Sequence, residues 1–202
     1  MLCPQLPVYG LDIETDTATD GLNPAVSSIV AVAVCTAESA EVMTGNEADV
    51  LRDTEAVMAA LPTGVFVTWN GSGFDLPFLV DRSRAAGVPL GLDTRLDRSL
   101  HTRSPLPGHA GSYRGNWHGH RHLDAYRVYR NDLRRLLDMS CSLKSIAGFV
   151  GLDAVEFDAA RVHELSRNDL RSYVASDARL ARLLALRRWP TAAPFIDQLA
   201  AV

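Results

Sequence analysis

Apolar residues recur along the chain with two different spacings, which predict strands alternating with helices. Short runs dominated by apolar and β-branched residues are typical of strands. We place strands at residues 8–14, 27–36, 42–44 and 65–68. Apolar residues three and four positions apart predict helices, which proline, glycine and capping residues end or begin. We place helices at residues 47–61, 75–86, 143–150 and 166–189.

The order of these elements predicts an α/β protein with a mixed β-sheet flanked by helices. The first connections are short enough for neighbouring antiparallel strands, which disfavours an all-parallel sheet. A length of 202 residues suits one domain, so we expect residues 1–202 to form a single domain. The segment at about 94–122 is rich in Pro, Gly, His and Arg, and we expect an insertion or loop there.

The composition excludes several other classes of protein. With 47% hydrophobic and 22% charged residues, the chain reads as an ordinary globular protein. Its longest apolar run, residues 29–35, is far shorter than the roughly 20 residues that cross a bilayer. Cys3, Cys35 and Cys141 are too widely spaced for a disulfide framework or a thiolate zinc site, so we expect the latter two to fill core space. We therefore expect a cytoplasmic protein with no signal peptide and no membrane partner.

Positive charge gathers in one part of an otherwise acidic chain. The net charge is −4, whereas residues 94–122 carry five arginines against Asp97. Such asymmetry allows an anionic ligand to be steered to one face. The alternating histidines at 118–122 suggest a zinc site, but no paired cysteines accompany them. A phosphate-contacting loop with Tyr113, Arg114 and Trp117 is favoured over zinc, and a plain exposed insertion over both.

Two acidic residues project from one face of the first predicted strand. Asp12 and Glu14 lie two positions apart, which places their side chains about 7 Å apart along the strand. Buried like charges are tolerated chiefly when a cation compensates them. The pair therefore suggests a cation site, although pairs of this kind also arise by chance.

Two further acidic positions follow predicted elements. Asp75 comes after a strand and a glycine-rich bend, where ligands often meet α/β proteins, but it could also simply cap the next helix. Tyr173 and Asp177 lie four apart, so they share one face of the last helix. For this pair alone, a solvated helix face is an equally good interpretation.

Taken in order, these motifs resemble the DEDDy 3′–5′ exonucleases of the ribonuclease H-like superfamily. The nearest likeness is the proofreading exonuclease domain of family B DNA polymerases and its stand-alone relatives. The three motifs read LDIET at 11–15, WNGSGFDLPF at 69–78 and YVASD at 173–177. The sequences HLD at 122–124 and SLKSIA at 142–147 also resemble the segment between the second and third motifs. The resemblance covers nearly the whole chain.

The resemblance also implies a subtype and a set of metal ligands. The related DEDDh enzymes carry a histidine five positions before the last aspartate, where this chain has a serine. Tyr173, four positions before it, indicates the tyrosine subtype. By this resemblance, Asp12, Glu14, Asp75 and Asp177 would hold two divalent cations, Mg²⁺ or Mn²⁺, and Tyr173 would orient the attacking water.

The implied substrate is single-stranded nucleic acid with a free 3′ end, DNA favoured over RNA, cleaved to nucleoside 5′-monophosphates. Thr15, Asn70 and Phe74 are the candidate substrate contacts, each of which could instead serve packing. An exoribonuclease or oligoribonuclease with the same site is a close alternative. A non-catalytic nucleic-acid-binding subunit and a phosphoesterase that uses the histidines are weaker ones. No partner polymerase or repair protein is identified by the residues.

Overall fold

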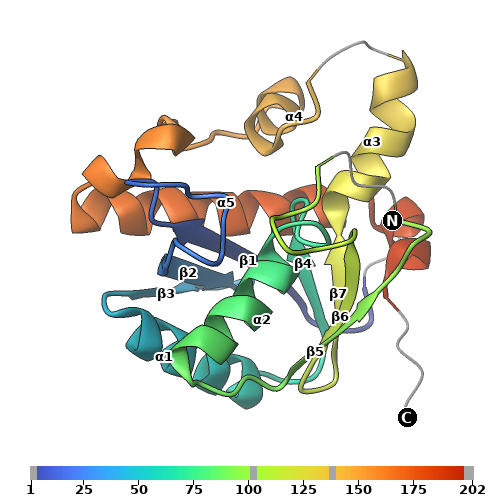
Figure 1. Ribbon diagram of the computed structural model, residues 1–202. Coiled ribbons are helices and arrows are strands. Elements are labelled where there is room, and N and C mark those ends of the chain that lie inside the picture. Colours follow the sequence, from blue (N-terminus) through green and yellow to red (C-terminus); the bar gives the residue numbers. More distant parts are fainter. Residues whose placement is uncertain (1–3, 101–103, 137–139, 198–202) are drawn as a thin grey trace.

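The computed structural model describes residues 4–100, 104–136 and 140–197, in which helices cover both faces of one seven-stranded sheet (Figure 1). The strands are β1 (Val8–Thr15), β2 (Ile29–Cys35), β3 (Ala40–Thr44), β4 (Val65–Thr68), β5 (Leu92–Leu96), β6 (Tyr113–Trp117) and β7 (His120–Asp124). The helices are α1 (Glu47–Ala60), α2 (Asp75–Ala86), α3 (Ala125–Leu136), α4 (Leu143–Phe149), α5 (Arg167–Arg187) and α6 (Trp189–Ala192). Two 3₁₀ turns, η1 (Ala159–Glu164) and η2 (Ala193–Phe195), complete the description.

The sheet is mixed, in the spatial order β3-β2-β1-β4-β7-β6-β5. Strand β1 pairs antiparallel with β2 and parallel with β4, and β4 pairs parallel with β7. Parallel strands end at the same edge of a sheet, so β1, β4 and β7 present their carboxyl ends together. This topology confirms the expected mixed α/β fold.

Each face of the sheet buries its own hydrophobic core. Helices α1 and α2 cover one face, where Met58, Phe66 and Phe78 are fully buried. Helices α3, α4 and α5 cover the other, where Leu123 and Leu180 are fully buried. Strands covered on both faces need apolar residues at nearly every position, which explains the continuous apolar runs of β2 and β4.

The expectation of a loop at about 94–122 is wrong at the two ends of that segment, whereas the described residues between Leu96 and Tyr113 form no helix or strand. Strands β5, β6 and β7 lie there and extend the sheet beyond β4. The sequence concealed them because polar side chains occupy buried positions and find partners inside the protein. His120, for example, accepts a hydrogen bond from the backbone of Gly64 and donates to the Met58 carbonyl oxygen.

The histidine-rich stretch is therefore largely structural. His120 and His122 are buried, which corrects the expectation of an exposed insertion, and burial lowers the pKa of His120. Among the described residues, the histidines form no cluster suited to a metal. His101 and Arg103 of the same segment lie outside the described residues, as does Cys3.

Other expectations hold with small changes. Cys35 is buried as predicted, whereas Cys141 is only half-buried. Helix α3 is not predicted from the sequence, because its many arginines leave too few apolar residues to show a helical spacing, although Val128 and Tyr129 pack in the core. In the part of the chain that the structure describes, no helix combines the length and apolar character needed to cross a bilayer.

Candidate active site

The carboxyl end of β1 lies against helix α5 and is also contacted by Asp75, the first residue of α2. Strand β1 pairs with β4 only as far as Gly10 and Val67, so its last residues leave one edge open toward α2. On the other side, α5 packs directly on β1. A Cβ atom at Gly10 would lie 1.9 Å from the Ala178 carbonyl oxygen, so only glycine permits this approach. The contact brings Asp177 of α5 beside the end of β1.

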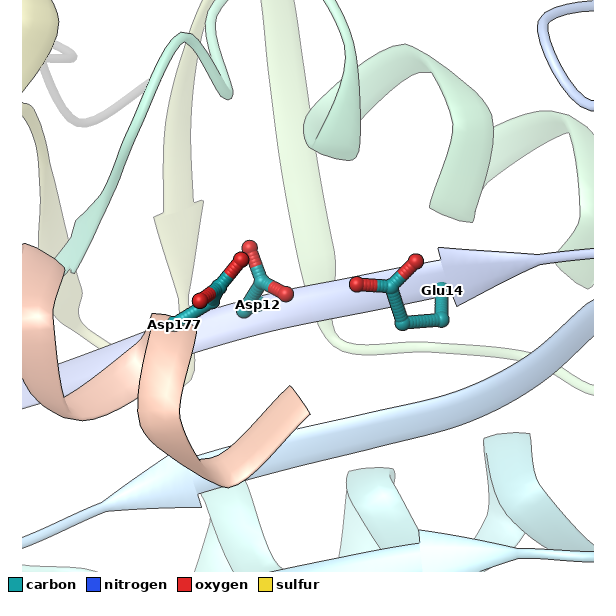
Figure 2. Close-up of side chains that lie close together, drawn as sticks. All are labelled: Asp12, Glu14 and Asp177. Atoms are coloured by element: carbon teal, nitrogen blue, oxygen red, sulfur yellow. The ribbon is translucent and has the colours of Figure 1, made fainter. Parts of the chain in front are cut away.

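Three carboxylates meet at this point, as Figure 2 shows. Asp12 and Glu14 project from the same face of β1, and Asp177 reaches them from α5. One oxygen from each lies within 4.8 Å of the others. The side chains thus converge more closely than their spacing along an ideal strand requires.

Asp75 adds a fourth carboxyl group next to these three. It is the first residue of α2, is almost fully buried, and accepts a hydrogen bond from the backbone of Ile13. Its negative charge contributes to the raised pKa of both Asp12 and Glu14. It lies outside the tightest group of three, yet belongs to the same charged site.

In the absence of a cation, the pKa values of all four acids are raised above their ordinary values. Burial is the largest cause, followed for Asp12 and Glu14 by the neighbouring carboxylates. The pKa of Asp12 is raised well above its usual value, that of Glu14 to about 8, that of Asp75 to about 8 and that of Asp177 to about 6. Buried groups of like charge with strongly shifted pKa values are a common feature of functional sites.

The donor set fits hard divalent cations. All the converging groups are carboxylate oxygens, which Mg²⁺ and Mn²⁺ prefer, and neither thiolate nor imidazole contributes. In addition, the Asp177 Oδ1 atom is buried without a hydrogen-bond partner among the described residues. A buried acceptor left unpaired in this way is consistent with a ligand atom waiting for a cation.

Lys144 is a basic member of the site that the sequence analysis did not single out. Its Nζ atom lies 3.4 Å from Asp177 Oδ2 and 3.7 Å from the centre of the Tyr173 ring. It lowers the pKa of Asp12, Glu14 and Asp177. The available signal was its uniqueness, since it is the only lysine in a chain with 20 basic residues.

Tyr173 lies one turn before Asp177 on α5, and its ring is buried between Lys144 and Phe157. Burial is the main cause that raises the pKa of its phenol far above the ordinary value, and the charges of Glu14 and Asp177 add to it. The hydroxyl therefore stays protonated at neutral pH. It can donate a hydrogen bond but is not a base.

The three candidate substrate contacts lie around this site with different degrees of freedom. The Thr15 hydroxyl donates to the Gly21 carbonyl oxygen, so only its backbone could be offered to a ligand. Asn70, in a left-handed conformation, and Phe74 belong to the bend that leads into Asp75. The Phe74 ring packs on Phe78 and remains partly exposed. Their placement permits the expected roles without testing them.

Comparison with known proteins agrees with this geometry. Residues 11–165 match the RNase_H_2 family model of the RNase_H superfamily, and the chain belongs to this superfamily. Among solved structures, it is similar to the family B DNA polymerase from the hyperthermophilic archaeon Pyrobaculum calidifontis, with 26% identity and a TM-score of 0.71. That match covers 93% of this chain and 25% of the polymerase, so the chain spans about a quarter of its length. Comparison with curated proteins finds no significant match.

The superfamily, the fold and the acidic cluster together suggest a nuclease that acts on nucleic acid with divalent metal. The resemblance seen in the sequence motifs is thereby confirmed at the level of the superfamily and of the polymerase-like fold.

Proposed function

We propose that the protein is a divalent-metal-dependent 3′–5′ exonuclease that removes nucleotides from the 3′ end of single-stranded DNA. The observation that carries this proposal is the convergence of Asp12, Glu14 and Asp177, with Asp75 beside them, on a fold shared with a family B DNA polymerase. Tyr173 on the same face of α5 as Asp177 supports the tyrosine subtype of these exonucleases.

In this proposal the carboxylates hold two cations, and the remaining residues position the reacting groups. The bound cations would make a water molecule nucleophilic and balance charge on the attacking and leaving oxygens. Asp12, Glu14 and Asp177 would hold one of them. Asp12 would also contact the second, with Asp75 assisting. The carboxylates would be fully ionised only with the cations in place, because burial and mutual repulsion otherwise favour their protonated forms.

Two residues of α4 and α5 act on the same centre. The protonated Tyr173 hydroxyl would donate a hydrogen bond that fixes the direction of the attacking water, since its raised pKa excludes a role as base. Lys144 places a positive charge beside Asp177 and limits the repulsion among the acids when no cation is bound. Both residues therefore position or balance charge.

The candidate substrate contacts come from the end of β1 and from the bend that leads into Asp75. The Thr15 backbone and the Phe74 ring would contact the terminal nucleotide, and Asn70 would contact a phosphate. Stacking of a base on an aromatic ring contributes about 1–3 kcal/mol and tolerates any base, which suits an exonuclease. Each cleavage would release a nucleoside 5′-monophosphate and leave a new 3′-hydroxyl.

Polarity and metal dependence can be tested together with two partial duplexes, one with a 3′ single-stranded tail and one with a 5′ tail. We expect Mn²⁺-dependent shortening of the 3′ tail that EDTA stops. Digestion that persists in EDTA or starts at a 5′ end would contradict the proposal. A matched RNA strand in the same reaction measures the preference between DNA and RNA.

A further inference from the structure

Strands β3 and β5 form the two margins of the sheet, and only the β3 margin is closed by side chains of the described structure (Figure 1). There, Arg171 of α5 donates a hydrogen bond to the Val42 carbonyl oxygen at 2.8 Å. Arg167 of the same helix donates one to the Thr44 carbonyl oxygen at 3.3 Å. Blocking an exposed edge in this way prevents another strand from pairing with it.

At the β5 margin, the backbone groups of alternate residues point outward. The Asp97 N–H donates to the Ser112 carbonyl oxygen at 2.9 Å, so odd-numbered residues direct their backbone groups toward β6. Because this direction alternates in an antiparallel pair, the N–H and C=O groups of Leu92, Thr94 and Leu96 face away from β6. In the described part of the chain β5 pairs with β6 alone, and these outward groups have no other hydrogen-bond partner.

The sequence of β5, LDTRL, is complementary to itself when it is reversed. In an antiparallel pair of two such strands centred on Thr94, Asp93 of one strand lies opposite Arg95 of the other, and the reverse. Leu92 likewise lies opposite Leu96. The centre also suits the backbone, because the residues that face outward would meet one another in hydrogen-bonded positions.

The two charged residues of β5 have no partner of opposite charge among the described residues. Asp93 and Arg95 are both exposed, and their side chains project from the same face of the strand. The residue opposite Arg95 on β6 is Arg114, which carries the same charge, and the residue opposite Asp93 is the neutral Asn116. The strand therefore presents one acid and one base, both unpaired, beside its open edge.

We propose that two copies of this chain associate through the outer edge of β5, which joins their sheets into one continuous sheet across a two-fold axis at Thr94. The outward backbone groups of the two strands exchange hydrogen bonds. Asp93 of each protomer pairs with Arg95 of the other, and Leu92 packs against Leu96. An interface of this kind uses the same surface twice, which the self-complementary sequence of β5 allows.

The interface is small, so the dimer forms reversibly as the protein concentration rises. Each acidic site stays whole within one protomer, because β4, β7 and β6 separate β1 from β5 in the sheet. The dimer is therefore independent of the proposed exonuclease function. Either proposal can fail without the other.

Sedimentation velocity at protein concentrations from about 1 μM to about 1 mM measures the association. We expect the average mass to rise from that of the monomer toward that of the dimer. Thr94→Pro removes the central outward N–H group and leaves the hydrogen bonds to β6 in place, since proline is tolerated at the outer edge of a strand. This variant should remain folded by circular dichroism and stay monomeric at every concentration.

Reversing the charges one at a time tests the ion pairs. Asp93→Arg places arginine opposite arginine, and Arg95→Asp places aspartate opposite aspartate, so each variant alone should associate at least about tenfold more weakly. An equal mixture of the two variants restores both ion pairs and should form a mixed dimer about as tightly as the wild type. Asp53→Arg, the same charge change on the exposed surface of α1, is the matched control and should not alter association.

Any of the following results would overturn this interface. The wild-type protein stays monomeric over the whole concentration range, a folded Thr94→Pro variant still forms the dimer, or the mixture of the two charge variants associates no better than each alone. If Thr94→Pro does not fold, the charge variants decide the question, because they leave the backbone hydrogen bonds of β5 unchanged.

Discussion

Two of the regions where this protein buries carboxylates differ in their surroundings in a way that separates structure from function. At the far side of the sheet, the Asp197 side chain is fully buried against β6 and β7. It accepts a hydrogen bond from His122 Nδ1 at 2.9 Å and one from the Gly115 backbone at 3.2 Å. The guanidinium of Arg114 is 3.2 Å away. Every oxygen of this carboxylate has a partner.

The acidic site at the end of β1 has the opposite balance. Asp12, Glu14 and Asp177 face one another with Lys144 as the nearest positive charge, and Asp177 Oδ1 has no hydrogen-bond partner in the described structure. The same fold provides hydrogen-bond and ion-pair partners for both oxygens of Asp197, but none for Asp177 Oδ1 among the described residues. The uncompensated group is therefore best explained by a partner from outside the chain, which the proposed function identifies as divalent metal.

The comparison is tested most severely by removing one charge from the acidic site. In Asp12→Asn the side chain keeps its shape but loses a ligand charge, so we expect at least a roughly thousandfold loss of exonuclease rate. Thermal stability without metal should be unchanged or higher, because a neutral amide replaces a buried acid whose ionised form is disfavoured there. Asp53→Asn, on the exposed surface of α1, is the matched control. A variant that keeps most of its activity would remove Asp12 from the proposed mechanism.

The opposite outcome is expected at the compensated carboxylate. Asp197→Ala leaves the fully buried His122 without its carboxylate partner and removes one of the two carboxylates that pair with Arg114, and breaking a buried pair in this way typically costs about 3–5 kcal/mol in the free energy of unfolding. For a chain of this size the melting temperature should fall by roughly 10 °C, as measured by circular dichroism. The rate per folded molecule should be retained on the p-nitrophenyl ester of thymidine 5′-monophosphate, a small chromogenic phosphodiester. An unchanged melting temperature would show that this cluster adds nothing to the fold.

The two regions should also respond differently to pH. Without metal, the folded protein raises the pKa of Glu14 and Asp75 to about 8, above the values of the unfolded chain, so the folded state binds more protons. This contribution to stability is present at low pH and is lost as pH rises toward 8 and beyond. We expect the metal-free protein to melt roughly 5 °C lower at about pH 9 than at about pH 6.

Adding Mn²⁺ should reverse this loss, and more strongly at the higher pH, because the cation binds the ionised carboxylates. Scanning calorimetry with and without Mn²⁺ measures both effects. The trend should weaken in Glu14→Gln, which removes one of the two titrating groups, and persist in Asp53→Asn. A melting temperature that rises with pH in the metal-free protein would contradict the assigned direction.

The smallest effect is expected at Tyr173. Tyr173→Phe removes the hydroxyl but leaves the ring between Lys144 and Phe157, so packing is preserved. If the hydroxyl orients water, the rate should fall by about tenfold with KM nearly unchanged. Because the group is not a base, the pH profile should keep its shape, which steady-state kinetics across pH would show.

The sequence predicted one half of the sheet better than the other for a physical reason. Strand β2 is covered on both faces and is apolar at nearly every position, so its pattern is visible in the sequence. Strand β7 contains His120 and His122, whose partners Met58 and Asp197 lie far away along the chain. No local pattern reveals that such residues are buried.

The same distinction applies to the acidic site. Alternation along a strand correctly placed Asp12 and Glu14 on one face. Periodicity could not tell that Asp177 would reach them, because this depends on the close approach of α5 to Gly10. The family resemblance supplied that link. Lys144 was overlooked because neither periodicity nor the resemblance assigned it a role.

The most direct test of the central claim is anomalous diffraction from a crystal soaked with Mn²⁺ and thymidine 5′-monophosphate. The account predicts manganese peaks among Asp12, Glu14, Asp75 and Asp177, about 3.5–4 Å apart if two ions bind as in two-metal nucleases. The peaks should be absent from the Asp12→Asn variant. Wild-type crystals with no manganese at these four carboxylates would contradict the account.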